Sequence, residues 1–368
     1  MIPIFKPSYD EREEIAVANV LQSRWTGLGP KVEEFEEKFA QYVGSKYAVA
    51  MNSATAALHT ALVLLGIHPG RDVEVLVPTI TFASTAHVVK YCGADPMFCD
   101  VHEKSLMLNE WDASNKLNYA TAALIYVLYG GQHPHASTLT VNPKIPIIWD
   151  CAHACGNTMF DGKGKLCCWS FHAVKNLSCG DGGMLTTDDR DHYERACCLR
   201  WLGINKSTHD RISGGYSWDY LIDEIGYKYH MNDLTAAIGL VQLEKMPEMQ
   251  KKRRELAWRY LNNLGNQAAI PELQLPQWSN EFSWHLFVIR TPLRDELSTY
   301  LRSKLVSTGV HYRPLHLYKC YGQQPALPVA EKVWPTLLTL PLFPDLTLKE
   351  VDIICEHIRD FFTTHHQK

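Results

Sequence analysis

Short apolar segments alternate with helical segments through the first half of this 368-residue chain, and no other feature constrains its fold as much. Such alternation is typical of an α/β domain with a mostly parallel sheet, because each helix carries the chain back to the edge where the next strand starts. We predict strands at Tyr47–Met51, Glu74–Val77, Pro96–Cys99, Ala122–Tyr126, Ile145–Trp149, Cys167–Phe171 and Gly183–Thr187, with helices at about Ala54–Leu65 and Phe82–Tyr91.

The ends of the chain add two further predictions. Ser8 and Glu11 have the spacing of a capping box, which predicts a helix from Tyr9 to about Ser23. Toward the C-terminus, a predicted helix from about Asp233 to Lys245 precedes a charged stretch, where we place a domain junction. The expected domains are therefore a large one over residues 1–248 and a small α+β one over residues 249–368.

The composition excludes several classes of partner. Lys and Arg number 36 against 40 Asp and Glu, so no general basic surface is available for nucleic acid or anionic membrane. No apolar run approaches transmembrane length, and Met1–Pro7 lacks the pattern of a signal peptide. The 11 cysteines are irregularly spaced, and a chain of this length does not need disulfides. We expect a cytoplasmic, soluble protein with reduced thiols.

Three reactive side chains follow predicted strands. Ser170 and Asp150 stand at strand ends, and Lys175 comes five positions after Ser170, just before a glycine-rich segment. Ligands of parallel sheets bind beyond the carboxyl ends of the strands. A lysine amine can condense with an aldehyde, a hydroxyl can help to hold a phosphate, and a carboxylate can keep a pyridine nitrogen protonated. These are the groups needed to bind and use pyridoxal 5'-phosphate (PLP), although Lys175 could also be a surface lysine and Asp150 a helix cap.

A phosphate site is predicted where the strand ending at Met51 turns into an apolar helix. The segment Ser53-Ala54-Thr55 begins that helix, and a helix N-terminus offers free N–H groups and a positive dipole end. Capping by Ser53 is compatible with this role. The chain contains neither the phosphate-binding motif of nucleotide hydrolases nor the dinucleotide-binding motif after a strand.

A metal site is a weaker interpretation. Cys151, His153 and Cys155 alternate with other residues, but this spacing is not a usual zinc pattern and no second pair stands at a suitable distance. We therefore expect no metal.

Several short motifs follow one another along the chain, and both their sequences and their order carry information. They are Trp25–Pro30, Asn52–Leu58, Pro78–Thr85, Asp150–Gly156, Ser170–Asn176, Gly226–Asp233, His311–His316 and Leu340–Pro344. Each is weak alone, but together they resemble the DegT/DnrJ/EryC1/StrS family of PLP-dependent aminotransferases, which act on nucleotide-linked keto sugars. The resemblance implies the type I aminotransferase fold, with a mostly parallel mixed sheet in the large domain and a small C-terminal α+β domain.

The resemblance also implies roles in binding the cofactor. Lys175 would bond to PLP and then move the proton between the amino donor and the cofactor, while Asp150 would pair with the pyridine nitrogen. His153 would lie near the phenolic oxygen or the ring face, and Phe82 would stack on the ring. The matching phosphate ligands are Ala54 and Thr55, with Ser53 beside them, and Ser170.

The segment Gly226–Asp233 departs from the commonest form of the family, because Lys228 stands in place of Asn and His230 in place of Arg. In the family this loop reaches the PLP phosphate of the neighbouring subunit. The resemblance therefore implies a homodimer with shared active sites and a phosphate contact from Lys228, and it leaves the role of His230 open.

The resemblance implies a reaction as well. L-glutamate would donate its amino group to PLP, and a keto sugar attached to a nucleoside diphosphate would receive it. A lysine at position 228 resembles the family members that act on 4-keto sugars more than those that act on 3-keto sugars. A PLP-binding regulator and a dehydratase relative are alternatives, although the dehydratases carry His where Lys175 stands. On the sugar-nucleotide side of the cleft, the matching residues are Trp25, Thr26, Tyr129, His311 and His316.

Overall fold

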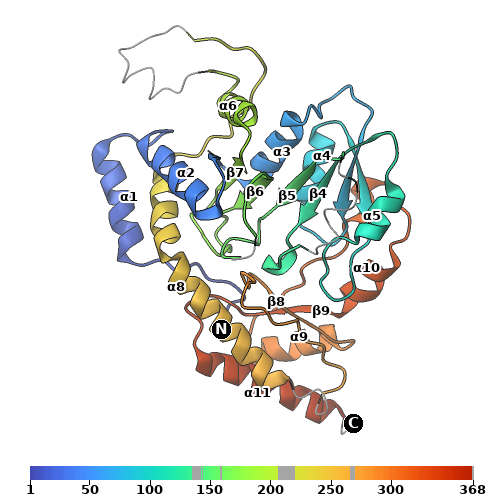
Figure 1. Ribbon diagram of the computed structural model, residues 1–368. Helices are drawn as coiled ribbons and strands as arrows, with labels where there is room; N and C mark the ends of the chain where they lie inside the picture. The colour runs from blue at the N-terminus through green and yellow to red at the C-terminus, as the bar shows by residue number, and fades with distance from the viewer. Residues whose placement is uncertain (135–141, 143, 158–159, 206–219, 266–269, 367–368) are drawn as a thin grey trace.

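The structure is a computed structural model that describes residues 1–134, 142, 144–157, 160–205, 220–265 and 270–366. Its main feature is a seven-stranded sheet covered by helices (Figure 1). The strands along the chain are β1 (Tyr47–Met51), β2 (Glu74–Pro78), β3 (Asp95–Cys99), β4 (Thr121–Val127), β5 (Ile147–Asp150), β6 (Leu166–Ser170) and β7 (Gly183–Thr187).

The order of strands in the sheet is β1-β7-β6-β5-β4-β2-β3. Strand β7 is antiparallel to both of its neighbours, while the pairs β2–β3, β2–β4, β4–β5 and β5–β6 are parallel. The prediction of a mostly parallel mixed sheet is confirmed.

Helices pack against the sheet through apolar side chains. The most enclosed is α3 (Ala54–Leu64), which contacts β6 and β7 and is buried from Ala56 to Leu64, as expected for a helix that is apolar on all sides. Helix α2 (Pro30–Val43) contacts β1 and α8 (Asp233–Leu264). The other helices of this part are α1 (Glu11–Ser23), α4 (Ser84–Tyr91), α5 (Glu110–Lys116) and α6 (Arg190–Leu199).

The predicted cap of the first helix is wrong by two residues. Helix α1 begins at Glu11, and its capping box is formed by Asp10 and Glu13. The side chain of Glu13 accepts a hydrogen bond from the backbone N–H of Asp10 at 2.9 Å. Ser8 donates instead to Asp345, at 2.7 Å. The sequence offers both pairs at capping-box spacing, and the contact with Asp345 decides between them.

Helix α8 (Asp233–Leu264) is much longer than predicted, with 32 residues. It continues through the charged stretch because one face stays buried, at Met249, Arg253, Leu256 and Tyr260, while Lys251 and Lys252 are exposed. The proposed boundary between residues 248 and 249 falls inside this helix and stays a prediction.

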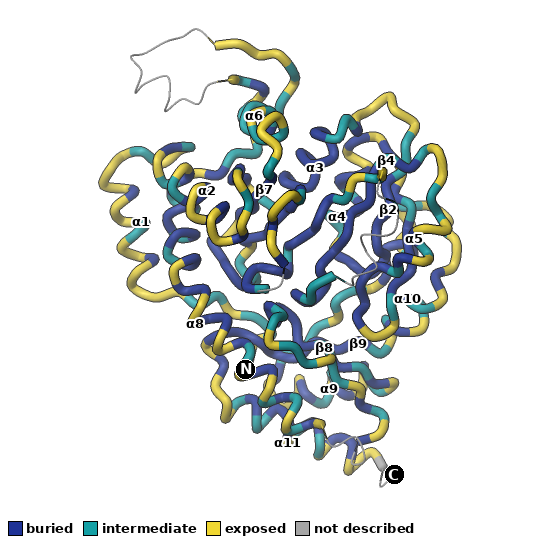
Figure 2. Tube along the Cα trace, viewed as in Figure 1, coloured by how far each residue is buried: buried dark blue, intermediate teal, exposed yellow. Residues whose placement is uncertain are grey.

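The C-terminal region builds a second apolar core. Strands β8 (Phe287–Arg290) and β9 (Leu337–Leu340) form an antiparallel pair, and α8 carries Leu256 and Tyr260 into this core while its first half packs on the large one (Figures 1 and 2). A small antiparallel sheet with helices therefore follows the large sheet, as the α+β prediction requires. The helices of this region are α9 (Arg294–Ser303), α10 (Pro328–Val333) and α11 (Leu348–His366), of which α10 packs its Ala330 and Val333 on the large core.

Candidate functional site

The predicted site residues gather at one edge of the large sheet. Strands β1, β2, β4, β5 and β6 all point the same way, so their carboxyl ends lie at one edge (Figure 1). Ser53, Tyr129, Asp150 and Ser170 each stand at or just after such an end. The topology thus brings together residues that are far apart in the chain.

Asp150 is a buried carboxylate at the end of β5. Thr85 donates a hydrogen bond to its Oδ2 at 3.0 Å, and the backbone N–H of Ala152 donates to its Oδ1 at 3.1 Å. Burial raises the pKa of Asp150, and these two hydrogen bonds and nearby Lys175 oppose that rise. A cationic N–H partner would compensate the carboxylate for its loss of water.

Lys175 lies in the turn that follows β6, where its backbone N–H donates to His172 at 2.8 Å. Burial lowers the pKa of its amine from 10.5 to about 8, and Asp150 opposes that change. A larger share of the side chain is thus the neutral amine near pH 7 than for a surface lysine, and the neutral amine is the form that attacks a carbonyl.

A candidate phosphate cradle lies where β7 begins. Gly183 pairs with Met51 on one side and with Ser170 on the other, so the ends of β1 and β6 are brought close together. A Cβ at Gly183 would lie 2.3 Å from the carbonyl carbon of Ser53 and 2.4 Å from the nitrogen of Ala54. Only glycine permits this approach to the start of α3, where Ser53 caps the helix by accepting from Ala56 at 3.1 Å.

The residues present fit PLP. The N-terminus of α3 and the nearby Ser170 hydroxyl suit its phosphate, Asp150 suits its pyridine nitrogen, and Lys175 suits its aldehyde. Ser53, Ala54 and Thr55 are all partly exposed, so the helix end is open to a ligand. The individual contacts stay predictions.

His153 is held by bonds on both ring nitrogens. Its Nδ1 accepts from the backbone N–H of Gly130 at 3.2 Å, so the proton of the neutral ring is on Nε2 and points to the Tyr312 hydroxyl oxygen, also at 3.2 Å. Burial lowers the pKa of His153 far below its ordinary value, and Lys175 and His311 add to the shift. The neutral imidazole therefore leaves the Tyr312 proton free to donate elsewhere.

Phe82 follows β2 and is 60% exposed, which is unusual for a phenylalanine. Its ring centroid lies 6.1 Å from that of Tyr312. An exposed aromatic ring beside these site residues suits stacking on a planar ligand.

The residues predicted to bind substrate have different surroundings. Tyr129 is buried, and its hydroxyl donates to the backbone carbonyl of His311. His311 bonds through Nδ1 to Thr339 at 2.8 Å, and burial lowers its pKa to about 4, with help from Lys175. His316 is buried between Thr79, at 2.7 Å, and Glu331, at 3.1 Å. Its two ring nitrogens are therefore already engaged within the chain.

Trp25 and Thr26 lie in a loop on the N-terminus of α8. The Trp25 indole donates to Leu28 at 3.2 Å, and the backbone N–H of Asp233 donates to Gly27 at 2.8 Å. Thr26 is exposed. The roles of these two residues stay predictions.

Lys228 and His230 sit beside the end of β1. The side chain of Asn52 donates to the Lys228 carbonyl at 3.2 Å, and the Lys228 ammonium lies 3.6 Å from the centroid of the Trp201 ring. The His230 ring meets the same indole edge to face, at 4.4 Å. Within the described residues Lys228 has no carboxylate partner, so its N–H groups are available to an anion.

Four residues close to the site were not singled out from the sequence: Thr85, Asn176, His285 and Tyr312. Thr85, Asn176 and Tyr312 lie inside the family-like motifs, so the motifs themselves held a signal for them. His285 lies between Trp284 and Leu286, in a segment that reads as an ordinary strand. Nothing local in the sequence marks it.

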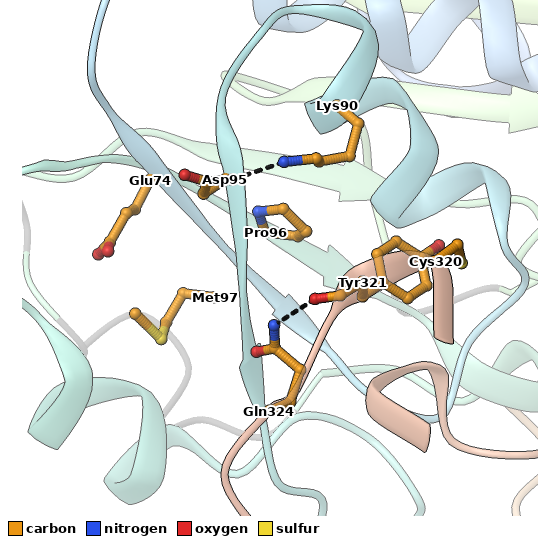
Figure 3. A pocket seen from close by; sticks show the side chains of 8 residues that line it. All are labelled: Glu74, Lys90, Asp95, Pro96, Met97, Cys320, Tyr321 and Gln324. Atoms are coloured by element: carbon orange, nitrogen blue, oxygen red, sulfur yellow. Dashed lines mark hydrogen bonds and ion pairs between the residues drawn. The ribbon is translucent and has the colours of Figure 1, made fainter. Parts of the chain in front are cut away.

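One cavity lies apart from the strand-end residues, and a second reaches one of them. One, of about 320 Å³, borders the edge strand β3, where Lys90 pairs with Asp95 at 2.6 Å (Figure 3). The other, of about 1010 Å³, is lined by Tyr129 among the predicted site residues. In the described part of the chain, no helix is long and apolar enough to span a bilayer, and no cluster of three or more potential ligands for a metal ion occurs.

The fold and the strand-end residues together define a PLP-dependent enzyme of the aminotransferase type. The model of the DegT/DnrJ/EryC1/StrS aminotransferase family matches residues 7–359, and the chain belongs to this family. It is a sugar aminotransferase, and its cofactor is PLP.

The chain is similar to known proteins over nearly its whole length. The chain is 36% identical to the spore coat polysaccharide biosynthesis protein SpsC of Bacillus subtilis, covering 98% of this chain and 96% of that protein. Spr1654 of Streptococcus pneumoniae, solved in PLP and PMP forms, has a TM-score of 0.91 in its PMP form, at 28% identity over 99% of this chain and 100% of that one. PseC of Helicobacter pylori, an aminotransferase involved in the biosynthesis of pseudoaminic acid, has a TM-score of 0.91 at 25% identity, over 99% of each chain.

Proposed function

We propose that this enzyme transfers the amino group of L-glutamate to a keto sugar linked to a nucleoside diphosphate, with a 4-keto-6-deoxyhexose as the preferred substrate. The observation that carries the proposal is the placement of Lys175 near the buried Asp150, at the sheet edge where the candidate phosphate cradle lies, so that the charge of each shifts the pKa of the other. Amination of a sugar is also consistent with the names of SpsC and PseC, which refer to polysaccharide and pseudoaminic acid biosynthesis.

Some of the residues hold the cofactor, and others hold or move protons. Bound PLP supplies an electron sink for the negative charge that develops at the donor carbon. Ser53, Ala54, Thr55 and Ser170 anchor the phosphate. Asp150 holds the proton on the pyridine nitrogen, and Lys175 Nζ moves a proton at the reacting carbon because its amine is partly neutral near pH 7.

The remaining predicted residues act around this centre. His153, with its proton on Nε2, would lie near the phenolic oxygen of the cofactor, and the exposed ring of Phe82 would stack on the cofactor ring. The sugar-nucleotide side of the site is lined by Trp25, Thr26, Tyr129, His311 and His316. Where the side chain already bonds within the chain, as in Tyr129 and His316, the residue acts by holding the neighbouring backbone in place.

We further propose a cytoplasmic homodimer in which each subunit contributes Lys228 to the phosphate site of the other. The exposed ammonium beside Trp201 supports this, since a lysine can meet a phosphate as a point charge. An isologous contact would supply both loops at once.

The first test is an absorbance spectrum of the purified protein with PLP, before and after addition of L-glutamate. We expect a band near the visible edge that moves to shorter wavelength as the amino form of the cofactor accumulates. Lys175→Ala should fold normally and lose the reaction by at least about 10³-fold, since its amine is both nucleophile and proton carrier.

The sugar substrate is identified with enzyme whose cofactor has first been converted to the amino form by L-glutamate. 4-Keto and 3-keto sugars on UDP, dTDP and GDP are compared by recovery of the visible band. Recovery only with 3-keto sugars would place the enzyme in the other branch, and turnover in Lys175→Ala at near-native rate would contradict the mechanism.

A further inference from the structure

Residues 283–285 form a buried link between three loops of the site. The backbone N–H groups of Ser283 and His285 donate to Gly131 and Gly130, at 3.0 and 3.1 Å. The Ser283 hydroxyl donates to the carbonyl of His153 at 2.5 Å. This short segment precedes β8, so the small sheet is tied directly to the turn after β4 and to the turn after β5.

The link reaches the Lys175 turn through its neighbour, Asn176. The Asn176 Nδ2 donates to the carbonyl of Cys155 at 3.1 Å and to that of Ser283 at 2.8 Å. Both N–H groups are thus used, and Oδ1 is left as an acceptor. The Nδ1 of His285, at 3.1 Å from this oxygen, must therefore carry a proton and donate it.

The ring of His285 has little freedom. It stacks on Phe5 with centroids 5.5 Å apart and planes 5° apart, and its centroid lies 4.4 Å from that of His153. Burial lowers its pKa far below the ordinary value, and the facing groups His153, Lys175, Arg253 and His311 add to the shift. A neutral ring with its proton on Nδ1 follows from the bond and from this environment.

We propose that His285 is a positioning residue for Lys175, which it orients through its hydrogen bond to Asn176. The proposal rests on the proposed function in one respect, namely that Lys175 is the lysine that bonds to PLP. Since Asn176 is the next residue, the bond fixes the backbone from which the Lys175 side chain starts. Without it, the turn can open and the amine of Lys175, a residue that is already partly exposed, gains further access to water.

Two substitutions of His285 separate the hydrogen bond from the bulk of the ring. In His285→Asn the side-chain nitrogen can take the place of Nδ1 and donate to Asn176. In His285→Gln the nitrogen is displaced toward the place of Nε2, and that bond is lost. Phe5→Leu is the matched control, because it loosens the packing of the same ring without removing the bond.

The readout is made without cofactor. The rate at which an amine reagent labels Lys175 is followed by mass spectrometry as a function of pH, and the midpoint gives the pKa of the amine. Because burial lowers that pKa to about 8, loss of the bond should move the midpoint upward, by at least about half a pH unit in His285→Gln. His285→Asn and Phe5→Leu should keep the midpoint of the parent protein.

An unchanged midpoint in His285→Gln, or an equal shift in His285→Asn, would overturn the proposal. Should His285→Gln fail to fold, Asn176→Ser removes the acceptor of the same bond and must shift the midpoint in the same direction. Failure of the proposed function would be seen separately, as the absence of a visible band when PLP is added to the parent protein.

Discussion

At the scale of single residues, the site places titratable groups close together away from water, which shifts the pKa values of Asp150 and Lys175. Burial raises the pKa of Asp150 and lowers that of Lys175 to about 8, while each charge partly stabilises the other. His153 and His285 stay neutral because they are buried next to the same cation. A lysine in such a place is chemically active at a pH where a surface lysine is not.

The lowered pKa of Lys175 predicts a pH-dependent stability of the cofactor-free protein. Between pH of about 8 and 10.5 the unfolded chain binds a proton that the folded chain does not, so this group adds stability as the pH rises. Relative to Lys175→Met, the free energy of unfolding should increase over this window, with a slope of at most about 1.4 kcal/mol per pH unit.

The measurement is a set of urea unfolding curves for both proteins from pH 7 to 10.5. The difference between them removes the contribution of every other titrating group. A difference that does not change across the window, or that falls with pH, would contradict the burial of the amine.

At the scale of secondary structure elements, the start of α3 has two roles. Ser53 caps the helix, and the same turn is the proposed anchor of the phosphate. Gly183 shows how closely the sheet is fitted to this turn, because its hydrogen atom occupies space that no side chain could share. The antiparallel strand β7 is therefore needed to bring the helix end and Ser170 together.

Ser53→Ala is expected to cost about 1 kcal/mol of stability through loss of the cap, and to weaken PLP binding about tenfold because the N–H groups of the first turn lose their order. Asn109→Ala is the matched control. Asn109 caps α5 by accepting from Trp111 and Asp112, at 3.0 and 3.2 Å.

Both variants should melt at similarly lowered temperatures, while fluorescence titration with PLP should distinguish them. Equal PLP affinity in Ser53→Ala and in the parent protein would mean that this turn does not hold the phosphate.

At the scale of the whole molecule, the two apolar cores are coupled through buried polar groups. Arg253 on α8 donates to the carbonyls of Leu342 and Trp284, at 3.0 and 3.3 Å, and burial lowers its pKa to about 9. The link through residues 283–285 joins the small sheet to the active-site loops. The C-terminal region thus helps to hold the loops of the candidate site in position.

The proposed sharing of active sites between two subunits predicts recovery of activity in mixed dimers. Lys175→Ala and Lys228→Ala should each be nearly inactive. After the two are unfolded and refolded together, half of the dimers are hybrids, and each hybrid has one intact site if Lys228 acts across the interface. The mixture should then recover up to about a quarter of the parent activity, measured as amino sugar formed per mole of subunit.

Mixing the folded variants without exchange of subunits serves as the control and should give no recovery. If Lys228 acts within its own subunit, co-refolding also gives none, because no site then contains both lysines.

The sequence by itself determined the sheet and the chemistry. Apolar runs located the seven strands of the large sheet, since a strand buried on both faces is apolar throughout, and the motifs that contain Asp150 and Lys175 indicated PLP. Only the tertiary structure decided features that depend on distant contacts. Asp345 selects the cap of α1, a continuous buried face extends α8 through a charged stretch, and the bond to Asn176 gives His285 its place. Such contacts join residues that are far apart in the chain, so no local pattern records them.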